Sequence, residues 1–353
     1  MVALKPEPIG DELLTSYLAR TAHLHGLNAY RFFAFHLPDL PIWNRDFDRT
    51  ASSEGLKRVA ALLGVSEEEV VAMTLKPYAR HLAGDGTGDG AVQPWVNAAG
   101  IYHRVRRRHA LQFCPRCLQA EPAFKRFWRL SFVVACDRHR CLLRDACAVC
   151  GAPVVPHRAN VSIVGCYHCG SRLPKAPVEP HPFAVDQVLT VQSRLLDAVK
   201  SGVFDLRSTT IRATEFFRGL RMLLLLARER IRFTPQAAPE LCGLPPYRLE
   251  LMRAYDRVAI IALIGRHLLA DFDALAAFLG NLGMTRAQFL RFGRLPDWLW
   301  DAVLSLPPGR APRRSSARSL QRELVRIRAE RSPGWRDRHA QLLMDWVGAT
   351  HGR

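Results

Sequence analysis

Paired metal-ligand residues between positions 114 and 169 constrain the fold of this chain more than any other feature. Eight of the nine cysteines lie in this stretch, and most stand in pairs two residues apart. The pairs are Cys114/Cys117, Cys136/His139, Cys147/Cys150 and Cys166/Cys169. A C-x-x-C turn points two sulfurs at one spot, so each pair can supply half of a tetrahedral zinc shell. Two halves separated by about 15 to 20 residues have the spacing of known zinc sites.

We therefore predict two structural zinc ions in this region. The first is held by Cys114, Cys117, Cys136 and His139, and the second by Cys147, Cys150, Cys166 and Cys169. Four protein ligands leave no open coordination position, which is typical of structural rather than catalytic zinc. The alternative is a disulfide framework. The absence of a signal-peptide pattern and the composition of an intracellular protein argue against it.

Two cysteines lie outside the predicted ligand sets, and several basic residues lie near these sets in the sequence. Cys141 is left over, and we expect a buried thiol that could exchange with a neighbouring ligand. We expect Cys242 to be a small core residue. Nearby basic side chains could offset the negative charge of the thiolates, namely Lys125, Arg126, Arg129, Arg138 and Arg144.

Composition sets the class of protein and its partners. The chain has 353 residues and a net charge of +18, with 48% hydrophobic residues. This length suits two or three domains with a real core. No apolar run approaches the roughly 18 residues of a membrane helix, so we expect no membrane partner and a cytoplasmic, nucleoid-associated location in a bacterial-type cell. The excess of positive charge predicts a polyanionic partner, most simply DNA.

The fold class that we predict is mainly α, with small zinc-binding modules of the ribbon or knuckle type. The expected division is 1–83 as an N-terminal helix-turn-helix-like domain, 84–110 as a flexible linker with a basic segment, 111–173 as a tandem zinc region, 184–306 as a C-terminal helical domain, and 307–353 as an arginine-rich arm. Residues 151–165 should form the short strands of a zinc ribbon. The C-terminal helices are expected at 184–199, 211–230, 246–269, 271–281 and 286–292.

The N-terminal region should begin with helices at 12–25, 29–35, 52–63 and 67–75, with Asp11 as an N-cap of the first. The last two helices, joined through Gly64 and capped by Ser66, have the pattern of a helix-turn-helix. Glu67, Glu68 and Glu69 occupy the positions that would face phosphates and bases. This pair is therefore better suited to a structural or protein-facing role than to DNA reading.

Three basic segments are candidates for nucleic-acid contact. The first contains Arg104, Arg106, Arg107 and Arg108, and the alternative for it is a solvated charged run. A second helix-turn-helix pattern at 271–292 presents Arg286, Gln288, Arg291 and Arg294, for which DNA contact and plain helical packing both stay open. The C-terminal arm contains Arg313, Arg314 and Arg318, which would bind a nucleic-acid backbone with strong salt dependence.

The sequence contains no Walker lysine motif, G-x-S-x-G, H-E-x-x-H or carboxylate set for phosphodiester cleavage. We therefore predict no catalytic residues and no enzymatic activity.

Two stretches resemble the TniQ family. Residues 8–20 read PIGDELLTSYLAR, which is similar to the opening motif of TniQ proteins. A second group of residues resembles the zinc region of the family. It consists of FCPRCL at 113–118, WRL at 128–130, Cys136 with His139, LL at 142–143, and Cys147 with Cys150. Together these stretches span roughly residues 6 to 170, and the match fades after about 180.

This resemblance implies a target-selection adaptor of Tn7-like, Tn5053-like or CRISPR-associated transposons. Such proteins do no chemistry: they bind DNA or a target-recognising complex and recruit an AAA+ ATPase of the TnsC or TniB type. An RNA-guided CRISPR effector and a second copy of the chain are further partners that the resemblance implies. Two alternatives stay open, a sequence-specific zinc-containing transcriptional regulator and a zinc-containing nuclease.

Overall fold

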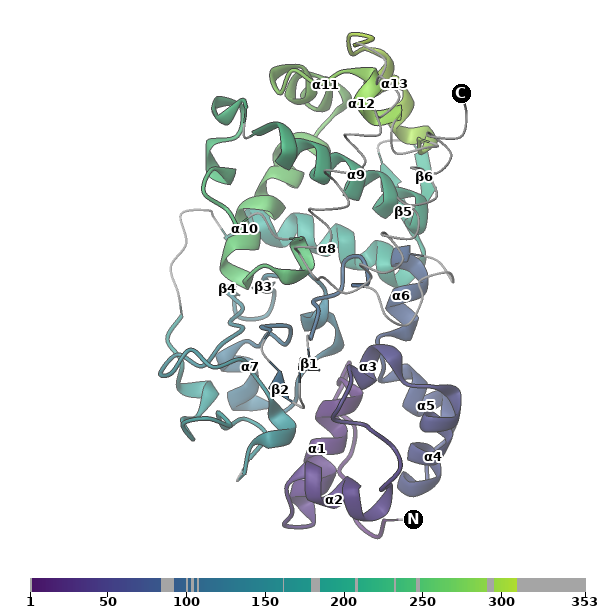
Figure 1. The fold of residues 1–353 in the computed structure, drawn as a ribbon, viewed down its shortest axis with the longest axis vertical. Coiled ribbons are helices and arrows are strands. Elements are labelled where there is room, and N and C mark those ends of the chain that lie inside the picture. The colour runs from purple at the N-terminus through teal and green to yellow at the C-terminus, as the bar shows by residue number, and fades with distance from the viewer. Residues whose placement is uncertain are drawn as a thin grey trace, which may run out of the picture.

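The computed structural model describes residues 2–83, 92–99, 101–102, 105–106, 108–160, 162–178, 185–206, 209–231, 233–245, 248–290 and 295–309. The N-terminal helices lie at one end of an elongated molecule, and the C-terminal helices form the other end (Figure 1). The region with the paired cysteines lies beside the N-terminal helices, and β3 (Ala135–Cys136) and β4 (Cys141–Leu142) of this region reach the C-terminal helices (Figure 1). Helices dominate, as predicted, and each sheet in the described part has two antiparallel strands.

The N-terminal region consists of short helices packed around α1. They are α1 (Leu14–Leu24), α2 (Ala29–His36), α3 (Phe47–Thr50), α4 (Ser53–Leu63), α5 (Glu67–Ala72) and α6 (Lys76–Ala83). The predicted N-cap of the first helix is wrong. Asp11 has a φ of 58°, and the N-cap position is occupied by Leu13, whose side chain makes no capping bond. The Asp11 carboxylate instead accepts hydrogen bonds from Arg126 and Tyr78.

The predicted turn between α4 and α5 is confirmed in detail. Gly64 ends α4 in the left-handed conformation, with a φ of 63° that favours a residue without Cβ. Ser66 then caps α5 by accepting a hydrogen bond from the Glu69 backbone, and the Glu69 carboxylate accepts one from the Ser66 backbone. This reciprocal capping box satisfies two backbone donors at the start of the helix.

The middle region contains only short elements. They are β1 (Ile101–Tyr102), β2 (Val105–Arg106), α7 (Pro115–Ala120), β3 (Ala135–Cys136) and β4 (Cys141–Leu142), with 3₁₀ turns at Arg126–Arg129, Pro156–Arg158 and Leu173–Lys175. The ribbon strands predicted at 151–165 are wrong. In the described part of this stretch, strand pairing is reduced to single bridges, Ala146 with Pro153 and Gly165 with Arg172. The stretch between the two cysteine turns instead contains the 3₁₀ turn at Pro156–Arg158.

The C-terminal region is a group of longer helices with one hairpin. Its elements are α8 (Val185–Ser201), β5 (Val203–Leu206), β6 (Thr209–Arg212), α9 (Ala213–Ile231), α10 (Ala254–Leu263), α11 (Phe272–Asn281), α12 (Arg286–Leu290) and α13 (Trp300–Leu304). The β5–β6 hairpin was not predicted. Its apolar signal is only two alternating residues, Phe204 and Leu206, which are both buried.

The single helix predicted at 246–269 is divided in the structure. A 3₁₀ turn at Leu249–Leu251 precedes α10, and a π turn at Ile264–Leu268 follows it. The start of α10 is fixed by Asp145 of the middle region, whose carboxylate accepts a hydrogen bond of 2.7 Å from the Ala254 backbone. A residue more than a hundred positions away therefore decides where this helix begins.

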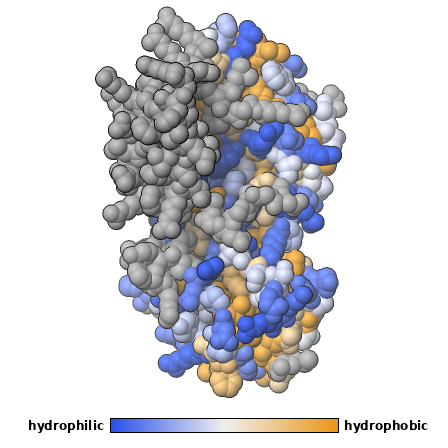
Figure 2. All heavy atoms as spheres, turned by 45° about the vertical axis from the view of Figure 1, so that its right-hand side comes forward, coloured by the Kyte–Doolittle hydropathy of each residue, from blue (hydrophilic) through white to orange (hydrophobic). Residues whose placement is uncertain are grey.

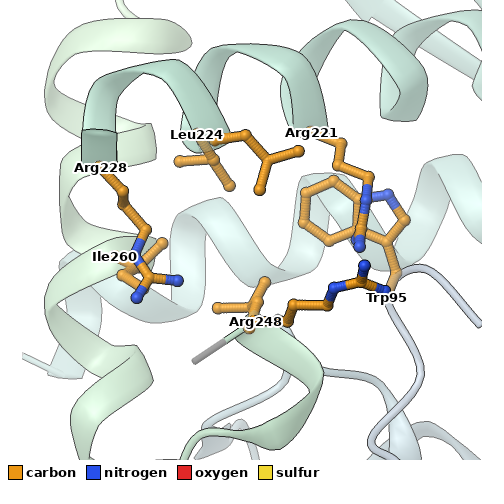
Figure 3. Close-up of a pocket in the computed structure, with 8 residues that line it drawn as sticks. Trp95, Arg221, Leu224, Arg228, Arg248 and Ile260 are labelled. Carbon is orange, nitrogen blue, oxygen red and sulfur yellow. The ribbon is translucent and has the colours of Figure 1, made fainter. Parts of the chain in front are cut away.

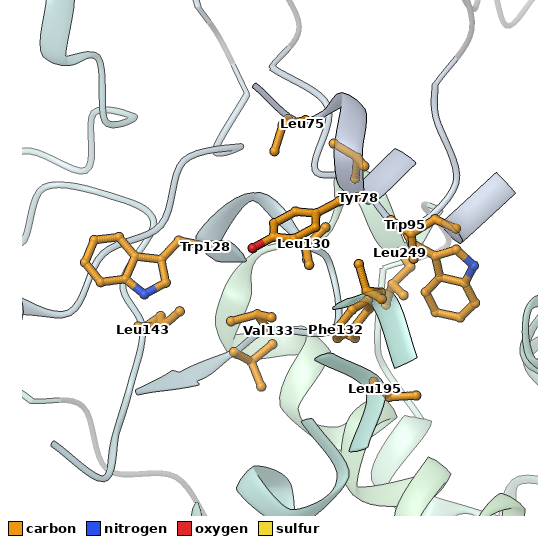
Figure 4. Packing of buried hydrophobic residues seen from close by; sticks show 14 of the residues in the cluster. Leu75, Tyr78, Trp95, Trp128, Leu130, Phe132, Val133, Leu143, Leu195 and Leu249 are labelled. Atoms are coloured by element: carbon orange, nitrogen blue, oxygen red, sulfur yellow. The ribbon is translucent and has the colours of Figure 1, made fainter. Parts of the chain in front are cut away.

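A single hydrophobic core runs through all three regions. Figure 4 shows Tyr78 of α6, Trp95, Phe132, Leu195 of α8 and Leu249 in one packed group. Trp95 lies within the predicted linker but is only 1% exposed. Its backbone N–H donates to the Glu250 carboxylate, at 2.8 Å. Residues 92–99 are thus part of the core, whereas residues 84–91 lie outside the described residues.

A buried ionic network joins the N-terminal helices to the middle region. The Arg129 side chain has no exposed surface and donates to both oxygens of the Asp46 carboxylate, at 3.1 and 2.6 Å. It also lies 3.5 Å from the carboxylate of Asp48, which accepts bonds from the backbone and hydroxyl of Thr15. Burial raises the pKa of Asp48, and the guanidinium of Arg129 opposes that shift.

Arg129→Met should lower the free energy of unfolding by about 3–5 kcal/mol, because it removes the cation beside the buried Asp48 and leaves Asp46 with Arg49, at 3.9 Å. Chemical denaturation would measure the loss. Arg138→Met is the matched control: its guanidinium is 61% exposed and pairs with Glu121 at 3.6 Å. The control should cost no more than about 1 kcal/mol. Equal effects of the two substitutions would contradict the assigned role of Arg129.

A second contact links α1 to the loop after Cys150. The His23 Nε2 atom lies 3.1 Å from the Ala159 carbonyl oxygen, and burial lowers the pKa of His23. A lowered pKa in the folded state means that protonation opposes folding. Stability from this group is therefore present above its ordinary pKa of about 6.5 and is lost as pH falls through the folded value.

The unfolding free energy of the parent protein should therefore fall more than that of His23→Gln when pH is lowered from 7.5 to 5.5 at fixed zinc concentration. Glutamine keeps a donor for the Ala159 carbonyl but does not titrate. Parallel pH profiles for the two proteins would show that His23 does not contribute to the pH dependence.

Candidate metal centres

The first cluster contains the four predicted ligands, which come from three local elements. Cys114 precedes α7, Cys117 lies in its first turn, Cys136 ends β3, and His139 follows in the turn to β4. One donor atom from each of them lies within 4.8 Å of all the others. The Nδ1 atom of His139 lies 3.4 Å from the Cys114 sulfur and 3.2 Å from the Cys117 sulfur.

The second cluster contains the four remaining predicted ligands and is built from two similar turns. The sulfur of Cys147 lies 3.7 Å from that of Cys169, and the sulfur of Cys150 lies 3.6 Å from that of Cys166. In each turn the glycine after the second cysteine donates its backbone N–H to the carbonyl of the first. These glycines, Gly151 and Gly170, have φ values of 71° and 74°, which a side chain would strain.

The donor sets fit a tetrahedral metal ion such as zinc. Bonds of about 2.3 Å to sulfur in a tetrahedron place neighbouring sulfurs about 3.7 Å apart. In the first cluster Cys117 and Cys136 are 3.6 Å apart, and the pairs of the second cluster have similar separations. All nine cysteines are free thiols, so the disulfide alternative finds no support.

Burial distinguishes the two centres. In the first, Cys114 and Cys136 are buried and Cys117 and His139 are partly buried, so this centre lies against the common core. In the second, Cys147 and Cys166 are buried in the same core, but Cys150 and Cys169 are exposed. We conclude that the first centre can stabilise the joint between the N-terminal helices and the middle region. The second centre mainly holds its own loops.

The remaining thiols follow the sequence interpretation only in part. Cys141 is buried, and its sulfur lies 3.7 Å from that of Cys114, although it is not one of the four mutually close donors. Its exchange with a ligand stays a prediction. The expectation for Cys242 is wrong, because it lies exposed in the turn after Leu241.

The basic residues expected to offset the thiolate charge have other partners. Lys125 and Arg138 pair with Glu121, Arg126 pairs with Asp11, and Arg129 pairs with Asp46. The Arg144 guanidinium donates to the Pro177 carbonyl at 3.0 Å. The pairs of Arg126 with Asp11 and of Arg129 with Asp46 hold the loop of the first centre against the N-terminal region, whereas the other pairs lie within the middle region.

The motif at 8–20 forms the other side of this joint. The buried Glu12 carboxylate accepts a hydrogen bond of 2.8 Å from the Ser16 hydroxyl and one of 2.5 Å from Arg20. The Ser16 oxygen in turn accepts a bond from the Phe124 backbone, which lies between the two halves of the first cluster. Burial raises the pKa of Glu12, and Arg20 opposes that shift. These motif side chains therefore connect α1 to the first metal centre.

The nucleic-acid candidates are not brought together by the described structure. Seven of them lie outside the described residues, namely Arg104, Arg107, Arg291, Arg294, Arg313, Arg314 and Arg318. Arg106 lies in β2, and Arg108 is half-buried. In α12 the Arg286 Nε atom donates to the Leu306 carbonyl, and the Gln288 side chain accepts a bond from the Thr285 backbone. Both side chains contribute to packing, and their contact with nucleic acid stays a prediction.

Two features of the joint were not found from the sequence. Asp46 and Asp48 lie in a polar loop and a short helix without a recognisable motif, and Trp95 lies in a segment that resembled a linker. A tryptophan beside a glycine-rich stretch was the one available signal for the burial of Trp95.

Among the described residues, no helix combines the length and apolarity needed to cross a bilayer.

Comparison with known families agrees with this geometry. The TniQ family model matches residues 3–143, which include α1, the buried ionic network and all four ligands of the first centre. Residues 3–143 therefore form a TniQ-family region, and this match supports an association of the protein with transposition. No curated protein matches the chain.

Cys114→Ser and Cys147→Ser should each remove one metal ion and unfold the local module, because zinc supplies about 10 kcal/mol or more of folding free energy in such sites. Cys114→Ser should also lower the unfolding temperature of the whole chain, since the loop between the ligand pairs of its centre carries Phe124 and Arg129, which bond to the N-terminal region. Cys242→Ser is the control. Mass spectrometry would measure the metal content, and limited proteolysis would detect local unfolding. Mutants with the metal content and protease resistance of the parent protein would refute the two-site assignment.

Proposed function

We propose that this protein is a non-catalytic adaptor that selects targets for DNA transposition. The match of residues 3–143 to the TniQ family is the observation that supports this function most directly. In this proposal the protein binds DNA or a target-recognising complex, such as an RNA-guided CRISPR effector, and recruits an AAA+ ATPase of the TnsC or TniB type.

Zinc has a structural role in the proposal. Cys114, Cys117, Cys136 and His139 would hold one ion and the four other clustered cysteines the second. Bound zinc would cross-link the loops of each module without taking part in a reaction. The first ion would fix the loop that carries Phe124 and Arg129, and through these residues the position of α1.

The N-terminal helices are suited to a protein partner. Glu67, Glu68 and Glu69 occupy the first turn of α5, and Glu68 and Glu69 are exposed. Three carboxylates at a helix N-terminus are stabilised by the helix dipole but repel phosphates. Large apolar side chains are also exposed nearby, at Leu4, Leu24, Leu27, Tyr30 and Phe35. Figure 2 shows apolar residues among hydrophilic ones at this end of the molecule.

The positive charge of the chain supports a nucleic-acid partner. The sequence carries 50 basic and 32 acidic residues. We propose that the C-terminal helices and the arginine-rich arm at 307–353 provide contacts to DNA or to the effector. Contacts to the phosphate backbone would weaken steeply as salt rises.

The adaptor function predicts that binding to the ATPase and binding to DNA can be separated. Glu68→Lys should abolish capture of the ATPase and transposition, but leave DNA binding unchanged or slightly stronger. Glu54→Lys, an exposed charge reversal in the first turn of α4, is the matched control. Co-purification with the ATPase and a plasmid transposition assay would measure the effect.

A selection on randomised and genomic duplexes at about 0.15 M salt would identify the target class. An enriched sequence would indicate that the chain reads its own site. Lack of enrichment would indicate that a partner molecule, rather than this chain, recognises the target. Sequence-specific binding without ATPase capture or any effect on transposition would instead favour a transcriptional regulator, and metal-dependent cleavage of supercoiled DNA would favour a nuclease.

A further inference from the structure

An open pocket of about 750 Å³ lies between the β5–β6 hairpin, the start of α9 and the 3₁₀ turn at Asp297–Leu299 that leads into α13. These elements lie together at the C-terminal end of the molecule (Figure 1). Leu206 and Ile211 of the hairpin contribute apolar surface, and Trp298 contributes an aromatic ring. A pocket of this volume can hold several side chains of a peptide segment.

The Trp298 ring is held in place by α9. A Cβ atom at Gly219 would lie 2.6 Å from the indole, so the ring lies directly against the helix at this point. The indole N–H donates to the Glu215 carbonyl at 3.4 Å, and the ring packs on Phe216. Trp298 is nevertheless only partly buried and lines the pocket. A fixed indole of this kind suits a guanidinium group, which stacks on aromatic rings.

Carboxylates outnumber guanidinium groups in the lining. Glu215 forms an ion pair of 2.8 Å with Arg218. The exposed carboxylates of Asp297 and Asp301 remain, beside the one further guanidinium of Arg212. Within the described part of the chain neither aspartate forms an ion pair. The local balance is therefore negative in a chain with a net charge of +18, and a cation that enters the pocket would be attracted.

The described chain ends on an element that packs against α13. The Arg286 backbone donates to the Pro307 carbonyl at 3.0 Å, which attaches the end of the described chain to the start of α12. This helix packs against α13, which carries Asp301. The next residues, 310–322, contain five arginines and no acidic residue. Because an extended chain spans roughly 3.3 Å per residue, this segment is long enough to return to the pocket.

We propose that residues 310–322 of the C-terminal arm dock into this pocket. One arginine would stack on Trp298, and others would pair with Asp297 and Asp301 through parallel hydrogen bonds. The alkyl stems of these arginines would pack on the apolar surface of the hairpin. A docked arm withholds its guanidinium groups from phosphates, so docking would compete with nucleic-acid binding by the same segment.

The lining favours an arginine-rich segment over a nucleic acid, because the carboxylates of Asp297 and Asp301 repel phosphates. The arm also has an advantage over a separate basic peptide. Its attachment to the same chain gives an effective concentration on the order of millimolar. Exposed ion pairs, although individually weak and sensitive to salt, are then sufficient for partial docking. Docking does not depend on a role in transposition and would stand if the arm did not bind DNA.

The first test uses the full-length protein without nucleic acid. Hydroxyl-radical labelling, read by mass spectrometry, measures the accessibility of the Trp298 ring. Replacement of Arg313, Arg314 and Arg318 by glutamine should raise this labelling about threefold, because the arm would no longer cover the ring. Salt at about 1 M should have the same effect on the parent protein. Trp300, which is 38% exposed and lies outside the described lining, is the internal control.

The second test changes the pocket and follows the arm. Asp297→Asn with Asp301→Asn should speed tryptic cleavage within residues 310–322 about threefold. The matched control is Asp273→Asn with Glu229→Gln, which removes the same charge from exposed positions, one of them also in the first turn of a helix. It should leave the cleavage rate unchanged. Asp297→Asn alone should give a smaller increase, and this single variant tests the pocket if the double variant does not fold.

Unchanged Trp298 labelling in the arm variant would overturn the proposal, and so would equal cleavage of the arm in the pocket variant and its control. An added arginine-rich peptide that lowers Trp298 labelling, in a protein whose labelling the arm substitutions do not change, would assign the pocket to a basic segment of a partner protein instead. Protection of Trp298 by duplex DNA in the arm variant would assign it to nucleic acid.

Discussion

The fully buried guanidinium of Arg129 is the constraint on which the arrangement of the molecule depends. A charge in a protein interior costs several kcal/mol unless it is paired and fully hydrogen-bonded. Asp46 and the Asn97 carbonyl accept bonds from the two terminal nitrogens of Arg129, Asp48 adds a second negative charge, and the buried Nε has no hydrogen-bond partner. Arg129 and its partners come from three separate stretches of the chain. The ion pairs therefore tie the N-terminal helices to the middle region.

The first metal centre and the N-terminal motif are two halves of one joint. Arg129 and Phe124 lie on the loop between the two ligand pairs of that centre, so the metal would limit the conformations available to the loop. The Phe124 carbonyl accepts a hydrogen bond from the Leu13 backbone, and the Phe124 N–H donates to the Ser16 hydroxyl oxygen at the start of α1. The TniQ match at residues 3–143 covers both halves.

The net charge of the chain gives little guidance to the location of a nucleic-acid surface. Arg257, for example, is fully buried, and burial lowers its pKa to about 10. It donates to the Gln112 side chain and to the Ser131 carbonyl. Arg126 and Arg286 likewise bond to carboxylate or carbonyl oxygens. Many arginines of this protein therefore act as internal cross-links. Others, namely Arg221, Arg228 and Arg248, line a small pocket beside α9 (Figure 3).

The sequence by itself determined the features that close within a few residues. The two ligand sets follow from C-x-x-C and C-x-x-H spacing, because each turn aims two donors at one point. The α4–α5 turn follows from Gly64 and Ser66, because both act on the adjacent backbone. Only the tertiary structure decided the role of Asp11, the burial of Trp95, and the start of α10 opposite Asp145. Each of these depends on contacts between residues far apart in the chain, and local propensity contains no information about such partners.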